Sequence, residues 1–147
     1  MPTTMDDKAK SKTVARYLVA AARILMGLPF LVSGLNGVLH FLPEPSPVLP
    51  EEATAFATAL LKTRYRMTLI FVTQLIVGGL LLANRFVPLA LALIAPFLVN
   101  AVAFHVFLEP SGRPIVLAFL ALEIYLAWAY RKAFRPMLAM RATPGAE

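Results

Sequence analysis

The chain has 147 residues, of which 59% are hydrophobic, 15% are charged and none is cysteine, and its formal net charge is +6. A soluble domain carries roughly a quarter of its residues as Asp, Glu, Lys and Arg, so this composition indicates a protein that folds in lipid. The length holds about four membrane crossings of about 20 residues and excludes a soluble catalytic domain, and the lack of cysteine excludes thiolate catalysis and Cys-ligated metal centres.

The pattern predicts an all-α fold, a four-helix transmembrane bundle over residues 14–135 with a short extracytoplasmic amphipathic helix between the first two crossings. A polar N-terminal segment precedes the bundle, and prolines at positions 43, 45 and 47 end the first crossing because they forbid helix. Pro50 and two glutamates suit the start of the amphipathic helix, which is too short and too charged to cross. The predicted elements are the N-terminal segment 1–13, crossings 17–42, 66–84, 86–108 and 115–134, the surface helix 50–64 and the C-terminal tail 136–147.

The distribution of Lys and Arg predicts the orientation in the membrane, because positively charged loops stay in the cytoplasm. Nine basic residues fall on the side of the two termini and the middle loop, and four fall on the other side, where four glutamates offset them. Both termini are therefore expected in the cytoplasm. The net charge of +6 then reflects topology and attraction to anionic lipid, and it does not indicate nucleic-acid binding.

Polar residues inside the predicted crossings are the candidate functional residues. A charge at mid-membrane costs roughly 2.5 to 3.5 kcal/mol, so Arg23 and Glu123 need partners. Counted from Arg16 and Arg131 at the cytoplasmic helix ends, their depths agree within roughly 2 Å, which predicts an Arg23–Glu123 ion pair with either a packing or a functional role. The candidate residues of the interior are Arg23, Ser33, Asn36, His40, Gln74, Asn100, His105 and Glu123.

One half of the first crossing is polar and rich in glycine, so it is expected to face the bundle interior. Ser33, Asn36, Gln74 and Asn100 then either form hydrogen bonds between helices or line a ligand pocket. The sequence favours the interhelical role and leaves the pocket open as the alternative.

Two similar segments indicate an internal repeat. Pro-Phe-Leu-Val leads to His40-x-x-x-Glu44-Pro in the first crossing and to His105-x-x-x-Glu109-Pro in the third. A parallel repeat would place a ligand site between the two halves. The two His–Glu pairs offer ligands for zinc, iron or manganese. The sequence supports a metal ion or a bis-His haem less than it supports hydrogen-bonded histidines.

Three blocks resemble the DoxX family of small four-helix bacterial membrane proteins: residues 23–36 (RILMGLPFLVSGLN), 78–82 (GGLLL) and 104–112 (FHVFLEPSG). The resemblance covers residues 14–134. It implies a multi-pass protein of the bacterial inner membrane that acts as a subunit or partner of an oxidoreductase linked to quinone or to oxidative stress. Many members carry an acidic residue where this chain has Gln74, so a proton or ion role is not carried over to that position.

Two classes of function follow. In the first, the chain is a membrane subunit of an electron-transfer system that offers Arg23, Asn36, Gln74, Asn100 and Glu123 to a quinone headgroup or a redox partner protein. In the second, it is a small transporter, ligand-binding protein or scaffold with a polar pocket inside the bundle. No nucleophile, base and orienting group form a catalytic set, so the sequence does not indicate a self-contained enzyme. The lipid bilayer is the expected partner, and a homo-oligomer is compatible with the small bundle.

Overall fold

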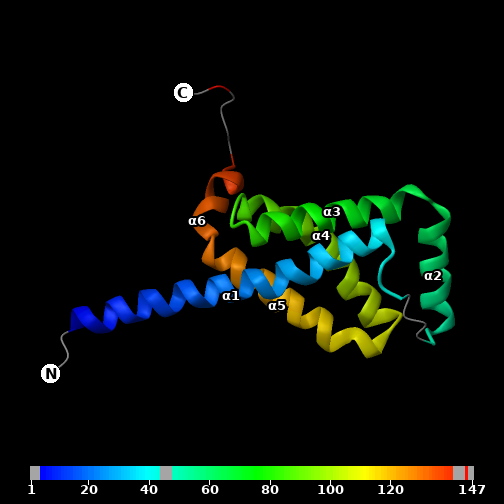
Figure 1. The fold of residues 1–147 in the computed structure, drawn as a ribbon, viewed down its shortest axis with the longest axis horizontal. Helices are drawn as coiled ribbons and strands as arrows, with labels where there is room; N and C mark the ends of the chain where they lie inside the picture. The colour runs from blue at the N-terminus through cyan, green and yellow to red at the C-terminus, as the bar shows by residue number, and fades with distance from the viewer. Residues whose placement is uncertain (1–3, 44–47, 141–144, 146–147) are drawn as a thin grey trace.

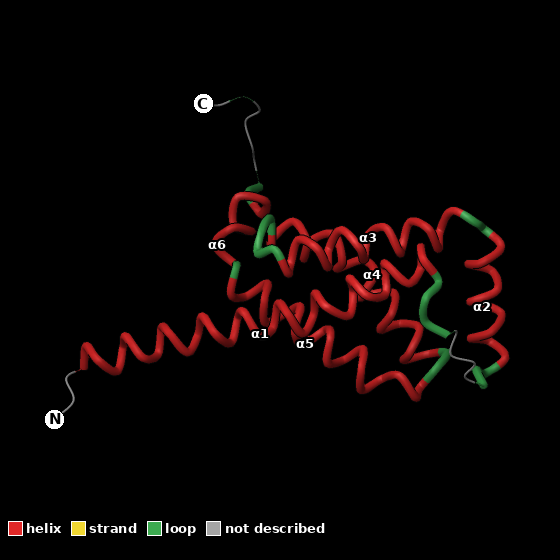
Figure 2. Tube along the Cα trace, viewed as in Figure 1, coloured by secondary structure: helices red, strands yellow, loops and turns green. Residues whose placement is uncertain are grey.

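The computed structural model describes residues 4–43, 48–140 and 145, and these residues form an all-α bundle (Figures 1 and 2). Four helices are long and apolar enough to cross a membrane, over Asp7–Leu39, Tyr65–Leu82, Val87–Phe107 and Pro110–Ala129. The chain is therefore a multi-pass membrane protein, as the composition predicts. The elements in chain order are α1 (Thr4–Leu39), α2 (Glu51–Lys62), α3 (Tyr65–Leu82), α4 (Val87–Phe107), η1 (Pro110–Gly112), α5 (Arg113–Ala129), α6 (Arg131–Phe134) and η2 (Arg135–Leu138).

The four long helices form a closed ring of neighbours. The most extensive contact joins α1 and α3, and further contacts join α3 to α4, α4 to α5 and α5 to α1. Buried apolar side chains from all four helices fill the centre, and among them Met26, Leu81, Ile94 and Leu126 are fully buried. Edge-on and tilted contacts of Phe30 with the rings of α4 and α5 complete this core.

The contact of α1 with α3 depends on glycine. A Cβ atom built on Gly34 would lie 2.5 Å from the backbone N of Leu75, and one built on Gly78 would overlap the backbone of Leu31. The two helices thus touch through their main chains, as small residues allow in membrane helices. The glycine-rich face of the first crossing does face the interior, as its sequence predicts.

Helix α1 is longer than the predicted crossing, since it begins at Thr4 and continues the N-terminal polar segment as helix. In Figure 1 this N-terminal part projects beyond the bundle. The helix ends at Leu39, and His40 follows with a positive φ of 51°. At the other end of the chain, the predicted fourth crossing is divided, because α5 ends at Ala129 and Tyr130 separates it from α6.

Helix α2 lies across the end of the bundle that is opposite the N-terminus (Figure 1). Glu51 and Glu52 lie in its first turn and Lys62 in its last, which suits the helix dipole. Ala53 of α2 is fully buried, and the Phe56 ring contacts the bundle, with its centroid 5.5 Å from that of the Phe104 ring. The short amphipathic helix between the first two crossings is thus present, and it covers the bundle mouth.

Candidate functional site

A cleft of about 650 Å³ lies between α2, α3 and α4. This volume falls within the range of small-molecule sites, and the walls are predominantly hydrophobic, as in such sites. Helix α2 closes one side of the cleft through the contact of Phe56 with Phe104. The apolar lining includes Phe56, Leu60 and Leu61 of α2, Leu69, Ile70 and Phe71 of α3, and Leu93, Ile94, Phe97 and Phe104 of α4.

Four polar side chains interrupt the apolar lining, namely Thr73, Gln74, Asn100 and His105. Gln74 is only 5% exposed, and its Oε1 accepts a hydrogen bond of 2.8 Å from the Ser33 hydroxyl across the contact of α1 with α3. Because the oxygen of the Gln74 amide is held by Ser33, its amino group is the part of the side chain that remains to donate. Asn100 is exposed on α4, and neither of its amide atoms has a hydrogen-bond partner among the described residues.

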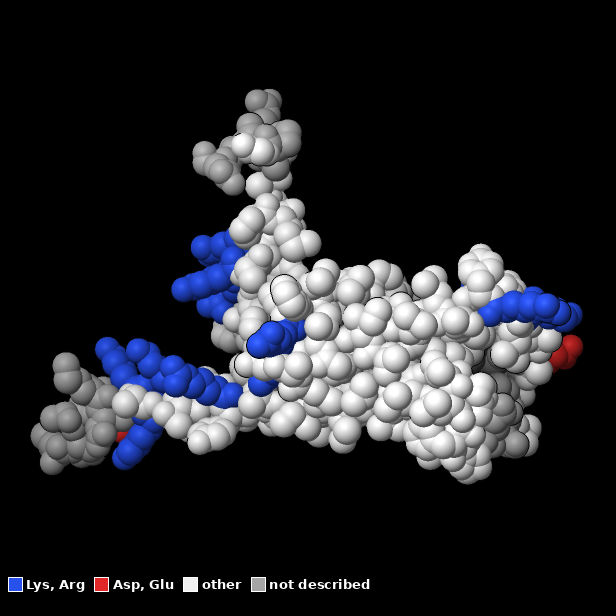
Figure 3. Space-filling model, turned by 45° about the horizontal axis from the view of Figure 1, so that its top comes forward, with Lys and Arg blue, Asp and Glu red and all other residues white. Residues whose placement is uncertain are grey.

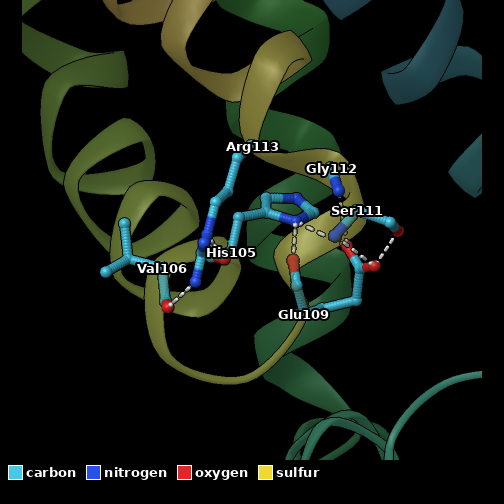
Figure 4. A network of polar contacts seen from close by, with 6 residues as sticks. All are labelled: His105, Val106, Glu109, Ser111, Gly112 and Arg113. Carbon is cyan, nitrogen blue, oxygen red and sulfur yellow. Dashed lines mark hydrogen bonds and ion pairs between the residues drawn. The ribbon is translucent and has the colours of Figure 1, made fainter.

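His105 stands at the end of the cleft and is held by Glu109 (Figure 4). Its Nδ1 lies 2.8 Å from the Glu109 carboxylate and 3.1 Å from the Glu109 carbonyl oxygen. Both partners are acceptors, so Nδ1 carries the proton and donates it. The other ring nitrogen, Nε2, makes no hydrogen bond within the described part of the chain and is the ring atom that a ligand can use.

Glu109 also closes the turn between α4 and α5. Its carboxylate accepts hydrogen bonds from the backbone N–H groups of Ser111, at 3.1 Å, and Gly112, at 3.0 Å, and from the Ser111 hydroxyl. The hydrogen bond from the Ser111 hydroxyl contributes most to lowering the pKa of Glu109 below its ordinary value, while burial opposes the shift. The Gly112 and Ser111 N–H groups and His105 lower the pKa further.

Two neighbours of this network fix its position. The Arg113 side chain donates to the carbonyl oxygens of His105, at 3.1 Å, and Val106, at 2.7 Å, near the C-terminal end of α4, where a cation is favourable. Gly112 packs directly against the imidazole, and a Cβ atom there would overlap the ring of His105. Residues 109–113 of the turn therefore pack against His105 and fix the position of its ring (Figure 4).

The predicted Arg23–Glu123 ion pair does not form in this structure. Nη1 of Arg23 instead donates a 3.1 Å hydrogen bond to the Leu81 carbonyl oxygen on α3. Nε of Arg23 and Oε2 of Glu123 are both buried without a hydrogen-bond partner in the described part of the chain. Matching depth sets only the height of a residue on its helix, whereas an ion pair also requires both side chains to point at each other.

The other predicted residues lie apart from the cleft. The Asn36 side chain accepts a 2.7 Å hydrogen bond from the backbone N–H of Leu42 and so closes the end of α1. His40 is exposed beyond that end, and Glu44 lies outside the described residues. Of the candidate metal ligands, the structure brings together His105 and Glu109, and it places no group of three potential ligands together among the residues it describes.

Sequence reasoning missed the contribution of α2 and the supporting role of the loop. The aromatic ring of Phe56 on an amphipathic helix indicates that this side chain packs against the bundle, but the sequence does not identify the crossing that it contacts. The order Glu109-Pro110-Ser111-Gly112 does contain a usable signal, because an acidic residue followed by proline is typical of a helix start with a side-chain cap.

Comparison with protein-family models, curated proteins and solved structures finds no match for this chain.

Proposed function

We propose that the cleft between α2, α3 and α4 binds a lipid-soluble quinone, and that the chain serves as a membrane subunit or partner of a quinone-linked oxidoreductase. The observation that carries the proposal is the composition of the cleft wall, which is apolar except for Thr73, Gln74, Asn100 and His105. A quinone complements such a wall, because it has an apolar ring and tail and two carbonyl oxygens that accept hydrogen bonds. The resemblance of residues 23–36 and 104–112 to the DoxX family supports the oxidoreductase context.

Three groups can bind the two carbonyl oxygens. The amino groups of Gln74 and Asn100 are hydrogen-bond donors, and Nε2 of His105 can donate when the ring is protonated and accept when it is neutral. Reduction of a quinone takes up two electrons and two protons, so a histidine at the headgroup is suited to proton exchange. The electrons would come from a partner protein or from a bound redox group, because the chain has no cysteine to hold an iron–sulfur cluster or a redox-active disulfide.

We also propose that the protein resides in the bacterial inner membrane with both termini in the cytoplasm. Support comes from the charge distribution, since Lys and Arg gather at the end that carries the N-terminal part of α1 and α6 (Figure 3). At this end the described basic residues outnumber those around α2 and the α4–α5 turn, as the positive-inside rule requires. The apolar cleft then lies toward the extracytoplasmic side, next to α2.

The proposal is tested by titrating the purified protein in detergent with decylubiquinone and measuring the bound fraction after removal of excess ligand. Asn100→Leu replaces the amide with an apolar group of the same number and branching of heavy atoms. Because Asn100 is exposed and has no partner in the described residues, the fold should persist. One lost hydrogen bond is worth about 0.5 to 1.5 kcal/mol, so the Kd should rise about two- to twelvefold. Ala57→Phe, which fills the cleft from α2, should weaken binding more.

Asn36→Ala is the matched control. It removes the same chemical group from a position outside the cleft, where Asn36 binds Leu42, and should leave the Kd within twofold of the unmodified value. Binding that does not saturate at one quinone per chain would contradict the proposal. So would equal effects of Asn100→Leu and Asn36→Ala, since they would place the ligand elsewhere.

A further inference from the structure

A second cleft, of about 500 Å³, lies at the opposite end of the bundle from α2. It is bounded by α1, by the end of α5 and by the turn between α3 and α4. Three arginines line it, namely Arg16 and Arg23 of α1 and Arg131 at the start of α6. Asn84 of the turn and the Tyr125 and Tyr130 side chains add further polar groups.

Two of the three arginines are held in place by contacts with the protein. Arg16 and Arg23 are seven residues apart, which is two helical turns, so they lie on one face of α1 about 10 Å apart along its axis. Arg23 is anchored by its bond to the Leu81 carbonyl oxygen, while its buried Nε has no partner among the described residues. Arg131 donates to the Trp128 carbonyl oxygen at 2.9 Å, and its guanidinium carbon lies 4.5 Å from the centre of the Trp128 ring.

None of the described residues that line this cleft is acidic. Glu123 lies on α5 two residues before Tyr125, but it does not line the cleft, and the ion pairs of the described residues include none between a glutamate and these arginines. Three positive charges at one cleft repel one another and favour an anion between them. Because no acidic side chain lines the cleft, the described part of the protein supplies no negative charge to balance the three arginines.

We propose that this cleft binds a phosphate group, carried by an anionic lipid headgroup or by a soluble phosphate ester. The guanidinium fork matches the oxygens of a phosphate, and the amino group of Asn84 supplies an additional donor. The hydroxyl of Tyr130 donates a 3.5 Å hydrogen bond to Oδ1 of Asn84, which leaves the Asn84 amino group to donate at the same edge of the cleft. Trp128 and Tyr130 are residue types that settle at the level of lipid headgroups, which is where lipid phosphates lie.

The test is native mass spectrometry of the full chain in detergent with phosphatidylglycerol, and with diacylglycerol of the same acyl chains, which lacks the phosphate. Phosphatidylglycerol should bind saturably, at one lipid per chain, and diacylglycerol should not. Arg16→Gln and Arg131→Gln should each weaken binding about tenfold, the effect expected for the loss of one hydrogen bond to a charged group. Both side chains are exposed, so these variants should keep the fold. Arg131→Lys, which retains the charge but loses the fork, should recover part of the affinity.

Arg85→Gln is the matched control, because Arg85 is exposed at the same end of the bundle and does not line the cleft. It should change the affinity less than twofold. Glycerol 1-phosphate distinguishes the two sources of the phosphate: binding as tight as that of the lipid indicates a soluble ester, and much weaker binding indicates the lipid. Equal binding of phosphatidylglycerol and diacylglycerol, or an equal loss in Arg85→Gln and Arg131→Gln, would overturn the proposal.

Discussion

Glu109 links the candidate site to the turn that follows it. One carboxylate holds the imidazole of His105 and also caps the first turn after Pro110, through the N–H groups of Ser111 and Gly112. The His-x-x-x-Glu spacing predicts that His105 and Glu109 come together, and this is observed. The capping role of Glu109 depends on the conformation of residues 110–112, which the His-x-x-x-Glu spacing does not predict.

The lowered pKa of Glu109 predicts an acid dependence of stability. A carboxyl group whose pKa is lower in the folded state than in the unfolded state stabilises the fold above the unfolded value, and this contribution is lost as the pH falls through the folded value. The thermal unfolding midpoint of the unmodified protein should therefore decrease below pH 4.5 more than that of Glu109→Gln. At pH 7 the variant should be the less stable of the two.

Thermal unfolding in detergent between pH 7 and pH 3.5 measures this difference. Glu52→Gln is the control, because Glu52 is exposed on α2 and makes no hydrogen bond among the described residues. Its difference from the unmodified protein should change less over the same range. If Glu109→Gln behaves in the same way as this control, the Glu109 carboxylate does not stabilise the turn.

Arg23 shows what residue patterns leave undetermined. Its depth along the helix, close to that of Glu123, follows from the helix register alone. Its hydrogen bond to the Leu81 carbonyl oxygen depends on the rotation of α1 against α3, which is set by the close contact at Gly34 and Gly78. Glycine patterns indicate that such a contact exists, but they do not identify the partner helix.

At the scale of helices, the length of each hydrophobic stretch predicts where a crossing lies. The exact residue at which a helix ends can be predicted only from additional signals such as proline. The proline-rich stretch predicts that the first crossing ends at residue 42, and helix α1 ends at Leu39. The break at Tyr130 between α5 and α6 has no proline or glycine to mark it, so apolar patterning alone extends the fourth crossing to residue 134. The polar residues 4–13 continue α1 because lysine and alanine are favourable in helices.

The contact between α1 and α3 predicts opposite effects for two adjacent glycines. In Gly78→Ala the new methyl group would overlap the backbone of Leu31, so the helices must separate, and destabilisation by about 1 to 3 kcal/mol is expected. In Gly79→Ala the methyl group meets nothing within 4 Å, and the better helix propensity of alanine should stabilise by up to about 1 kcal/mol.

Unfolding of both variants in detergent and denaturant gives the comparison directly, with the unmodified protein as the reference. The two substitutions are chemically identical and lie one residue apart, so differences in expression or detergent binding largely cancel. Equal destabilisation by both, or a neutral effect of Gly78→Ala, would show that the helices do not meet at Gly78.

At the scale of the whole molecule, composition and length predict the class of fold, and the four-helix arrangement is observed. The cleft could not be predicted, because its walls come from three helices and its shape depends on how α2 crosses the bundle mouth. Gln74, Asn100 and His105 are all in the predicted set of interior residues. Which of the eight candidates share one cleft is decided only by the packing.

The orientation gives a prediction that the natural lack of cysteine makes simple to test. A single cysteine is introduced at Ser11 near the N-terminus, at Met140 near the C-terminus, or at Ala59 on α2, all exposed positions. In intact bacterial cells, a membrane-impermeant maleimide should label Ala59→Cys. It should label Ser11→Cys and Met140→Cys only after the membrane is permeabilised. Labelling of either terminal position in intact cells would contradict the proposed orientation.

The most direct test of the quinone cleft is photolabelling of the membrane-embedded protein with an azido-quinone, followed by mass spectrometry of the peptides. The label should attach to lining residues of α2, α3 and α4, including the region from Leu93 to His105, and excess decylubiquinone should suppress it. Asn100→Leu should reduce the labelling at low probe concentration. Label that resists competition, or that falls on the lipid-facing sides of α1 and α5, would contradict the assignment of this cleft as the quinone site.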